Sequence, residues 1–211
     1  MQWYYDFISP FAYLQSTRLS EFADDPELTL KPVLFAGLLQ HWGSVGPAEI
    51  PPKRDWTFQH VVWLAARDGI EFRLPPYHPF NPLPLLRLAI VLDNELAAVQ
   101  RIFRYVWAEG KVPQDDDAFQ QLLTELAVKP QQLDSPAVKQ SLRDNGEAAI
   151  AQGVFGVPTF VAQNQAFWGY DATDMVHAYR QAQAGDSAAV WPADDLRAVL
   201  QLPEGQGRKR H

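Results

Sequence analysis

Cysteine is absent from this chain of 211 residues. The absence excludes disulfide bonds, thiolate metal ligands, cysteine nucleophiles and any dithiol redox reaction carried out by the protein's own side chains. Long hydrophobic runs are missing too, because the longest aliphatic run covers only residues 88–92. A helix that crosses a bilayer needs about 20 apolar residues. We therefore expect no membrane span and no membrane partner.

Basic residues are few, with 18 Lys and Arg against 25 Asp and Glu, and the formal charge is −7. Arg208, Lys209 and Arg210 stand together near the end, so the rest of the chain is more acidic than this total suggests. An acidic body is a poor partner for nucleic acid. We expect residues 204–211 to form a disordered basic tail.

The N-terminal residues lack the features of a secretory signal. Asp6 is acidic, no basic residue precedes Arg18, and Pro10 stands where an apolar stretch would be needed. Together with the absence of cysteine, this favours a cytoplasmic location.

Several common site motifs are also missing. The sequence contains no glycine-rich phosphate loop and no Gly-x-Ser-x-Gly motif, so a dinucleotide site and a Ser-His-Asp hydrolase are both disfavoured. The histidines show neither metal-ligand spacing nor an accompanying carboxylate cluster, and we expect no metal site. They are His41, His60, His78, His177 and His211.

What the chain does have is apolar surface, with 47% hydrophobic and 12% aromatic residues, enough to fold around a core. Residues 2–7 read as an aromatic strand. Ser9 followed by Pro10 is typical of a helix N-cap and first helical position, and we expect that helix to end near residues 24–26. The alternation in residues 28–35 predicts a second strand, irregular at Pro32.

Helical spacing dominates the middle of the chain. A loop is expected at residues 37–52 and an extended proline-rich connector at residues 74–84. Apolar residues recur at intervals of three and four in the segments 58–66, 88–106, 119–126 and 133–150.

Strands return after the helical region. Residues 159–162 and 166–168 read as a hairpin, and Asp171 is suited to cap a last helix. The order β-α-β, helices, β-β-α is that of a thioredoxin-like fold with a large all-helical insertion. We expect residues 1–36 and 153–185 to form the thioredoxin-like domain, residues 37–152 the insertion, and residues 186–211 a C-terminal extension.

Five stretches carry a resemblance to a known family. They are YDFISPFAYL (5–14), PPKR (51–54), PFNPL (79–83), GVFGVPTF (153–160) and FWGYD (167–171). They resemble the 2-hydroxychromene-2-carboxylate isomerases, which are relatives of kappa-class glutathione transferases and of DsbA disulfide oxidoreductases. The resemblance implies a thioredoxin fold and glutathione as cofactor.

The resemblance also implies a role for Ser9. The redox relatives carry Cys-x-x-Cys where this chain has residues 9–12, and neither cysteine position holds sulfur here, so disulfide exchange is excluded. In the isomerases a serine in this place lies beside the sulfur of bound glutathione. A hydroxyl donor at a helix N-terminus stabilises a thiolate and lowers its pKa. Ser9 is thus the candidate catalytic residue; the alternative is an ordinary N-cap.

The remaining glutathione-binding roles follow from the same resemblance. Val157-Pro158 would be a cis peptide whose backbone pairs with the cysteinyl part of glutathione, the alternative being a trans proline before a strand. Tyr170 and Asp171 would hold the γ-glutamyl end, and Lys53 the glycyl carboxylate. Asp171 could instead be a plain cap, and Lys53 a solvated lysine. Many relatives have Arg after this Asp, where the chain has Ala172, and one contact is therefore missing.

Three residues are candidates for contact with substrate. Phe11 and Trp168 are aromatic residues near the expected cleft, with core packing as the alternative. Asn81 could orient the substrate or the thiol, or could be a turn residue. Many relatives have Ser at the next position, where this chain has Pro82, and we therefore expect a different loop shape.

The function indicated is a glutathione-dependent isomerase acting on 2-hydroxychromene-2-carboxylate or a related unsaturated aromatic keto acid. The expected partners are a small-molecule substrate and, as an assembly, a second copy of the chain. Two alternatives stay open. One is a kappa-like glutathione transferase or peroxidase, and the other is a non-catalytic DsbA-like binding protein that lacks its dithiol.

Overall fold

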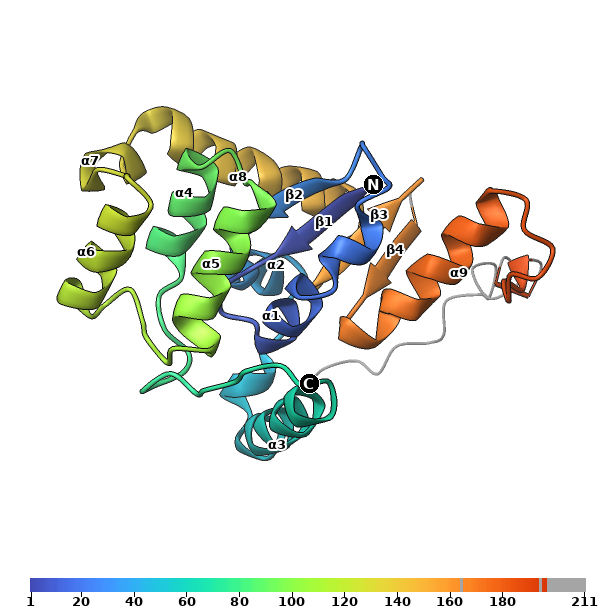
Figure 1. Ribbon diagram of the computed structural model, residues 1–211, viewed down its shortest axis with the longest axis horizontal. Coiled ribbons are helices and arrows are strands. Elements are labelled where there is room, and N and C mark those ends of the chain that lie inside the picture. The colour runs from blue at the N-terminus through green and yellow to red at the C-terminus, as the bar shows by residue number, and fades with distance from the viewer. Residues whose placement is uncertain (164, 194, 197–211) are drawn as a thin grey trace. The chain divides into compact units, whose positions relative to one another are not determined.

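A computed structural model describes residues 1–163, 165–193 and 195–196. Its sheet is built from β1 (Gln2–Tyr5), β2 (Thr29–Pro32), β3 (Thr159–Ala162) and β4 (Gln165–Trp168) in the order β2-β1-β3-β4 (Figure 1). β1 pairs with β2 in parallel, whereas β3 is antiparallel to both β1 and β4. The predicted parallel crossover and the predicted hairpin are therefore both observed.

Most of the residues between β2 and β3 along the chain are helical. In chain order the helices and 3₁₀ turns are α1 (Pro10–Ser16), η1 (Leu19–Phe22), α2 (Phe35–His41), η2 (Pro47–Glu49), α3 (Pro51–Arg67), α4 (Leu83–Val91), α5 (Leu96–Trp107), α6 (Asp116–Glu125), α7 (Pro130–Leu133), α8 (Pro136–Ala151), η3 (Tyr170–Ala172) and α9 (Thr173–Gln183). None of the described helices is long and apolar enough to cross a bilayer.

The two faces of the sheet have different cores, because side chains alternate along β1. Trp3 and Tyr5 point to one face, where their rings stack at 4.6 Å, and Phe103 of α5 packs against both. Tyr4 points to the other face, into a cluster that includes Leu38 of α2 and Ala149 of α8. The sheet is thus covered by α1 and α5 on one side and by α2 and α8 on the other (Figure 1).

The first helix is shorter than its sequence predicts. It ends at Ser16, not near residues 24–26, and a separate 3₁₀ turn follows. The hydroxyls of Ser16 and Thr17 donate to the carbonyls of Tyr13 and Leu14 at 2.6 and 2.8 Å. Such side-chain bonds compete with continuation of the helical ladder.

Other boundaries also differ from the prediction. The second strand ends at Pro32, and α2 begins where strand and then loop were expected, while α3 starts inside the expected loop at Pro51. The long apolar repeat of residues 88–106 is divided between α4 and α5, because Asp93 and Asn94 adopt φ of 53° and 54°. The proline-rich connector contains no helix or strand up to Leu83, the first residue of α4.

Packing divides the chain into two compact units, Met1–Thr173 and Asp174–His211. The first holds the sheet and helices α1 to α8. The second contains most of α9, and within it the rings of Tyr179 and Trp191 meet edge to face at 5.0 Å. The predicted division into thioredoxin-like domain, insertion and extension stays a prediction. The predicted disordered tail, residues 204–211, lies outside the described residues.

Candidate active site

The turn from β1 into α1 brings Ser9 against a segment 148 residues away. Ser9 is the N-cap of α1, as predicted, and its Oγ accepts a hydrogen bond from the Ala12 N–H at 3.2 Å. The same hydroxyl donates to the Val157 carbonyl at 3.3 Å. Ser9 is buried, with 8% of its surface exposed. One hydroxyl therefore does two tasks, capping the helix and holding the opposite loop.

That opposite loop contains the Val157-Pro158 peptide, which is cis, as the resemblance implied. The Pro158 carbonyl accepts from the Gly169 N–H at 2.9 Å, and this bond ties the loop to the end of β4. Among the described residues, the Val157 N–H has no hydrogen-bond partner. The loop therefore presents a backbone donor beside the hydroxyl of Ser9.

The residues just before Ser9 are held in place by distant side chains. Trp107 Nε1 donates to the Phe7 carbonyl at 2.8 Å. His78 Nε2 lies 2.9 Å from the Ile8 carbonyl. Because a carbonyl oxygen only accepts, Nε2 of His78 carries the hydrogen. Burial lowers the pKa of His78 below its ordinary value, which favours the neutral ring.

Asp6 anchors the same turn from inside the protein. It is 1% exposed, and its two carboxyl oxygens accept from the Ile8 N–H at 3.1 Å and the Phe35 N–H at 2.8 Å. The carboxyl group thus joins the turn before Ser9 to the first turn of α2. Burial raises the pKa of Asp6 to about 7, although its backbone hydrogen bonds act in the opposite direction.

Gln15 is a buried amide that joins three parts of the site region. Its Oε1 accepts from Trp3 Nε1 at 2.7 Å, and its Nε2 donates to the Gly169 carbonyl and to Thr173 Oγ1, both at 2.9 Å. Gln15 is completely buried. It therefore fixes α1 relative to β1 and to the turn after β4.

Gln15→Leu is expected to lower the free energy of unfolding by about 2 kcal/mol, because it leaves several buried polar groups without partners. Urea unfolding followed by circular dichroism measures the change. Gln59→Leu, at an exposed position of α3, is the control and should change stability by less than about 0.5 kcal/mol. Equal stability of the two variants would show that the Gln15 bonds are replaced by water.

Two of the predicted substrate-contacting residues are the aromatic residues Phe11 and Trp168. Phe11, two residues after Ser9, is half-buried and meets the His60 ring of α3 at 5.9 Å. Trp168 is 55% exposed, and its ring contacts Phe155 edge to face at 5.0 Å. A Cβ at Gly156 would lie only 2.5 Å from Trp168 Nε1, so glycine at that position permits the close approach. Trp168 is thus exposed and Phe11 partly exposed, and their proposed contacts with substrate stay predictions.

Lys53 and Asn81 are less closely tied to Ser9. Lys53 is exposed in the first turn of α3. Asn81 is exposed, its Oδ1 accepts from the Leu83 N–H at 3.1 Å, and its carbonyl accepts from Gln114. This bond pattern fits a turn residue at the start of α4. The proposed ligand contacts of both residues stay predictions.

Tyr170 and Asp171 follow Gly169. The φ of this residue is 102°, a conformation that only glycine adopts readily. The Tyr170 hydroxyl donates to Asp68 at 2.5 Å, and this carboxylate is also bonded to Arg67. The Arg67 bond is the largest cause that lowers the pKa of Asp68 to about 2. Asp171 is exposed inside the 3₁₀ turn η3, whose cap is Gly169, so its predicted position as helix cap is wrong.

Sequence reasoning did not find Asp6, Gln15, Asp68 or His78. Asp6 had a detectable signal, since it is a charged residue inside the aromatic run before Ser9. The other three gave none, because their partners lie between 12 and 158 residues away along the chain.

Known proteins share this architecture. The profile of a family described as DSBA-like thioredoxin domain matches residues 1–181. A 2-hydroxychromene-2-carboxylate isomerase of Pseudomonas putida is 29% identical over 188 residues, which cover 84% of this chain and 92% of that protein. Glutathione S-transferase kappa 2 of Caenorhabditis elegans is 27% identical over 176 residues, covering 75% and 78%.

Solved structures agree with the sequence matches. The structure of a 2-hydroxychromene-2-carboxylate isomerase aligns with a TM-score of 0.73 at 26% identity, covering 89% of this chain and 98% of that one. The predicted thioredoxin-like fold and the family resemblance read from the sequence are both confirmed.

Proposed function

Because this chain belongs to the family of DSBA-like thioredoxin domains, we propose that it is a glutathione-dependent isomerase. Its substrate would be 2-hydroxychromene-2-carboxylate or a related unsaturated aromatic keto acid, as the similarity to isomerases of that name suggests. The chain has no cysteine in the place where the redox relatives carry two, so the thiol must come from outside the protein.

One observation carries the proposal. The hydroxyl of Ser9 is directed at the Val157 carbonyl across the site, and the neighbouring Val157 N–H has no partner among the described residues. Binding of a cysteinyl residue needs two groups. One is a hydroxyl that can turn toward its sulfur, and the other is a backbone donor that can pair with its carbonyl. The residues present therefore fit glutathione.

Named residues would hold the tripeptide. Val157 and Pro158 would pair with its cysteinyl backbone, Tyr170 and Asp171 would face its γ-glutamyl end, and Lys53 would approach its glycyl carboxylate. When bound, glutathione supplies a thiolate that adds reversibly to a conjugated double bond, which lets that bond rotate before elimination.

Ser9 would activate the thiol through its hydroxyl hydrogen. To do so, Oγ would release the Val157 carbonyl and donate to the sulfur, while it would keep the bond from the Ala12 N–H. A charge-assisted hydrogen bond of this kind lowers the pKa of the thiol. Since α1 has only seven residues, we assign the activation to this hydroxyl more than to the helix dipole. Phe11 and Trp168 would contact the aromatic ring of the substrate.

Removing glutathione tests this function directly. Isomerase activity toward 2-hydroxychromene-2-carboxylate is expected to disappear on dialysis and to return when glutathione is added, because the chain has no thiol of its own. Calorimetric titration should show that glutathione binds. Full activity of the dialysed protein would exclude the mechanism, and absence of binding would favour the non-catalytic alternative.

The similarity to kappa-class glutathione transferases supports a second candidate, a transferase or peroxidase that uses the same site. Product analysis separates the two activities. An isomerase returns all glutathione unchanged, whereas a transferase consumes it and accumulates a conjugate, and a peroxidase oxidises it.

Asp171→Ala tests the proposed γ-glutamyl site. If the Asp171 carboxylate binds the ammonium group, its loss should weaken glutathione binding by about tenfold. Asp171 is exposed, so the variant should fold normally. Asp174→Ala, also exposed, is the matched control. Equal glutathione affinity of wild type and Asp171→Ala in calorimetry would leave the residue without a binding role.

A further inference from the structure

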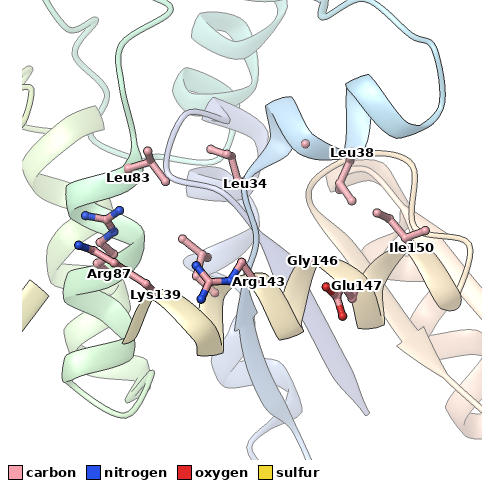
Figure 2. Close-up of a pocket in the computed structure, with 11 residues that line it drawn as sticks. Leu34, Leu38, Leu83, Arg87, Lys139, Arg143, Gly146, Glu147 and Ile150 are labelled. Atoms are coloured by element: carbon pink, nitrogen blue, oxygen red, sulfur yellow. The ribbon is translucent and has the colours of Figure 1, made fainter. Parts of the chain in front are cut away.

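A cavity lies between α2, α4 and α8, with a volume of about 360 Å³ (Figure 2). This volume is within the range of pockets that bind small molecules. None of the residues assigned to the glutathione site lines it. Its walls include five apolar side chains, Leu34, Leu38, Leu83, Leu142 and Ile150.

The cations gather toward one end of the cavity. Figure 2 shows Arg87 and Lys139 close together at that end, Leu38 and Ile150 at the other, and Arg143 between them, with Glu147 between Arg143 and Ile150. The described lining residues include three cations and one carboxylate, that of Glu147. The lining is therefore net positive, whereas the chain as a whole has a net charge of −7.

The cations are held in position but keep donors to spare. Asp134 lies 3.0 Å from both Arg87 Nη1 and Lys139 Nζ, and so fixes these two side chains together. The Nε of Arg87 is buried and has no hydrogen-bond partner within the described part of the chain. Buried donors are almost always satisfied, so this nitrogen is available to an acceptor that enters the cavity. Among the residues that the structure describes, Arg143 is bonded only to the uncharged Gln140.

Two helical glycines contribute to the lining of the cavity. Gly37 in α2 and Gly146 in α8 both line it, and a Cβ built at either position meets no atom within 4 Å. Glycine is unfavourable inside a helix by roughly 1 kcal/mol relative to alanine. Neither position has a φ that requires glycine. A side chain much larger than alanine at Gly37 or Gly146 would therefore fill part of the cavity.

We propose that this cavity binds a small organic anion with an apolar body, a carboxylate of the medium-chain type. The carboxylate would lie between Arg87, Lys139 and Arg143, where it supplies the acceptor that Arg87 Nε lacks, and the apolar part would extend toward Leu38 and Ile150. A free inorganic anion would leave the apolar walls without a partner, and a neutral apolar molecule would supply no charged acceptor for Arg87 Nε or for Arg143.

The site is separate from the one at Ser9. Leu38 and Ile150 line the cavity and also pack in the cluster that contains Val157, so apolar side chains stand between the two sites. Binding in the cavity therefore does not need glutathione, and the inference stands independently of the proposed isomerase activity.

Titration calorimetry of the full-length protein with octanoate, below its micelle concentration, tests the proposal. Octanoate should bind saturably, 1-octanol at least about tenfold more weakly, and acetate not measurably, because each lacks one of the two kinds of contact. The same titration with glutathione present should give the same affinity, which separates this site from the one at Ser9.

Four variants locate the binding. Arg143→Gln should weaken octanoate about tenfold, and Gly146→Met should abolish binding by filling the cavity. Gly146→Ala and the distant Arg104→Gln are the matched controls and should bind as wild type does. Arg143 is exposed, so Arg143→Gln remains decisive even if Gly146→Met does not fold. Absence of saturable octanoate binding, or unchanged affinity in Arg143→Gln, would overturn the proposal.

Discussion

Ser9→Asp is expected to give a protein that folds nearly as well as wild type but loses about 99% of its isomerase activity at neutral pH. Asp is as good an N-cap as Ser, so its carboxylate can still accept from the Ala12 N–H. It cannot donate to the Val157 carbonyl, and that loss costs about 1 kcal/mol of stability. Beside the sulfur, its negative charge raises the pKa of the thiol by roughly two units, which leaves about a hundredth of the thiolate.

Steady-state kinetics and urea unfolding of the same preparation measure both effects. Ser9→Thr is the matched control, because it keeps a hydroxyl and a good cap. Ser9→Ala supplies an independent readout, since the ultraviolet absorbance of the bound thiolate should then titrate at higher pH than in wild type. If the thiol titrates at the same pH in both proteins, Ser9 is only a helix cap and activation comes from another group.

The local signals around Ser9 could be read from sequence because they depend on neighbouring residues. A serine followed by proline starts a helix wherever its surroundings allow, and the structure has α1 starting there. The hairpin at residues 159–168 is equally local. The cis peptide at Pro158 was predicted through family resemblance alone, since most X-Pro bonds are trans.

Features that depend on distant contacts could not be read in this way. The helix at Phe35–His41 lies where alternation suggested strand and glycine suggested loop, and its first N–H is held by Asp6, 29 residues earlier. The Gln15 bonds and the Tyr170–Asp68 pair likewise join segments that no local pattern relates. Tertiary contacts decide between helix, strand and loop when local preferences are weak.

The buried carboxyl group of Asp6 is expected to make the protein less stable as the pH rises from about 4 to 7. Burial raises the folded-state pKa of Asp6 from 3.8 to about 7, so between these values the folded protein binds a proton that the unfolded chain has lost. The free energy of unfolding then falls with rising pH and levels off above the folded pKa. A difference of about three pKa units corresponds to roughly 4 kcal/mol across this window.

Urea unfolding at a series of pH values between 4 and 9 measures this loss, and Asp6→Asn isolates it. Asn does not titrate and keeps one carbonyl oxygen for a backbone N–H. The free energy of unfolding of the variant should therefore lack the part of the pH dependence that comes from Asp6. His78 acts in the opposite direction, because burial lowers its pKa and protonation therefore opposes folding, but subtracting the two profiles cancels its contribution. Gln59→Leu, which changes no titrating group, should keep the wild-type profile. Parallel profiles for wild type and Asp6→Asn would show that the carboxylate stays ionised in the folded protein, held by the N–H groups of Ile8 and Phe35.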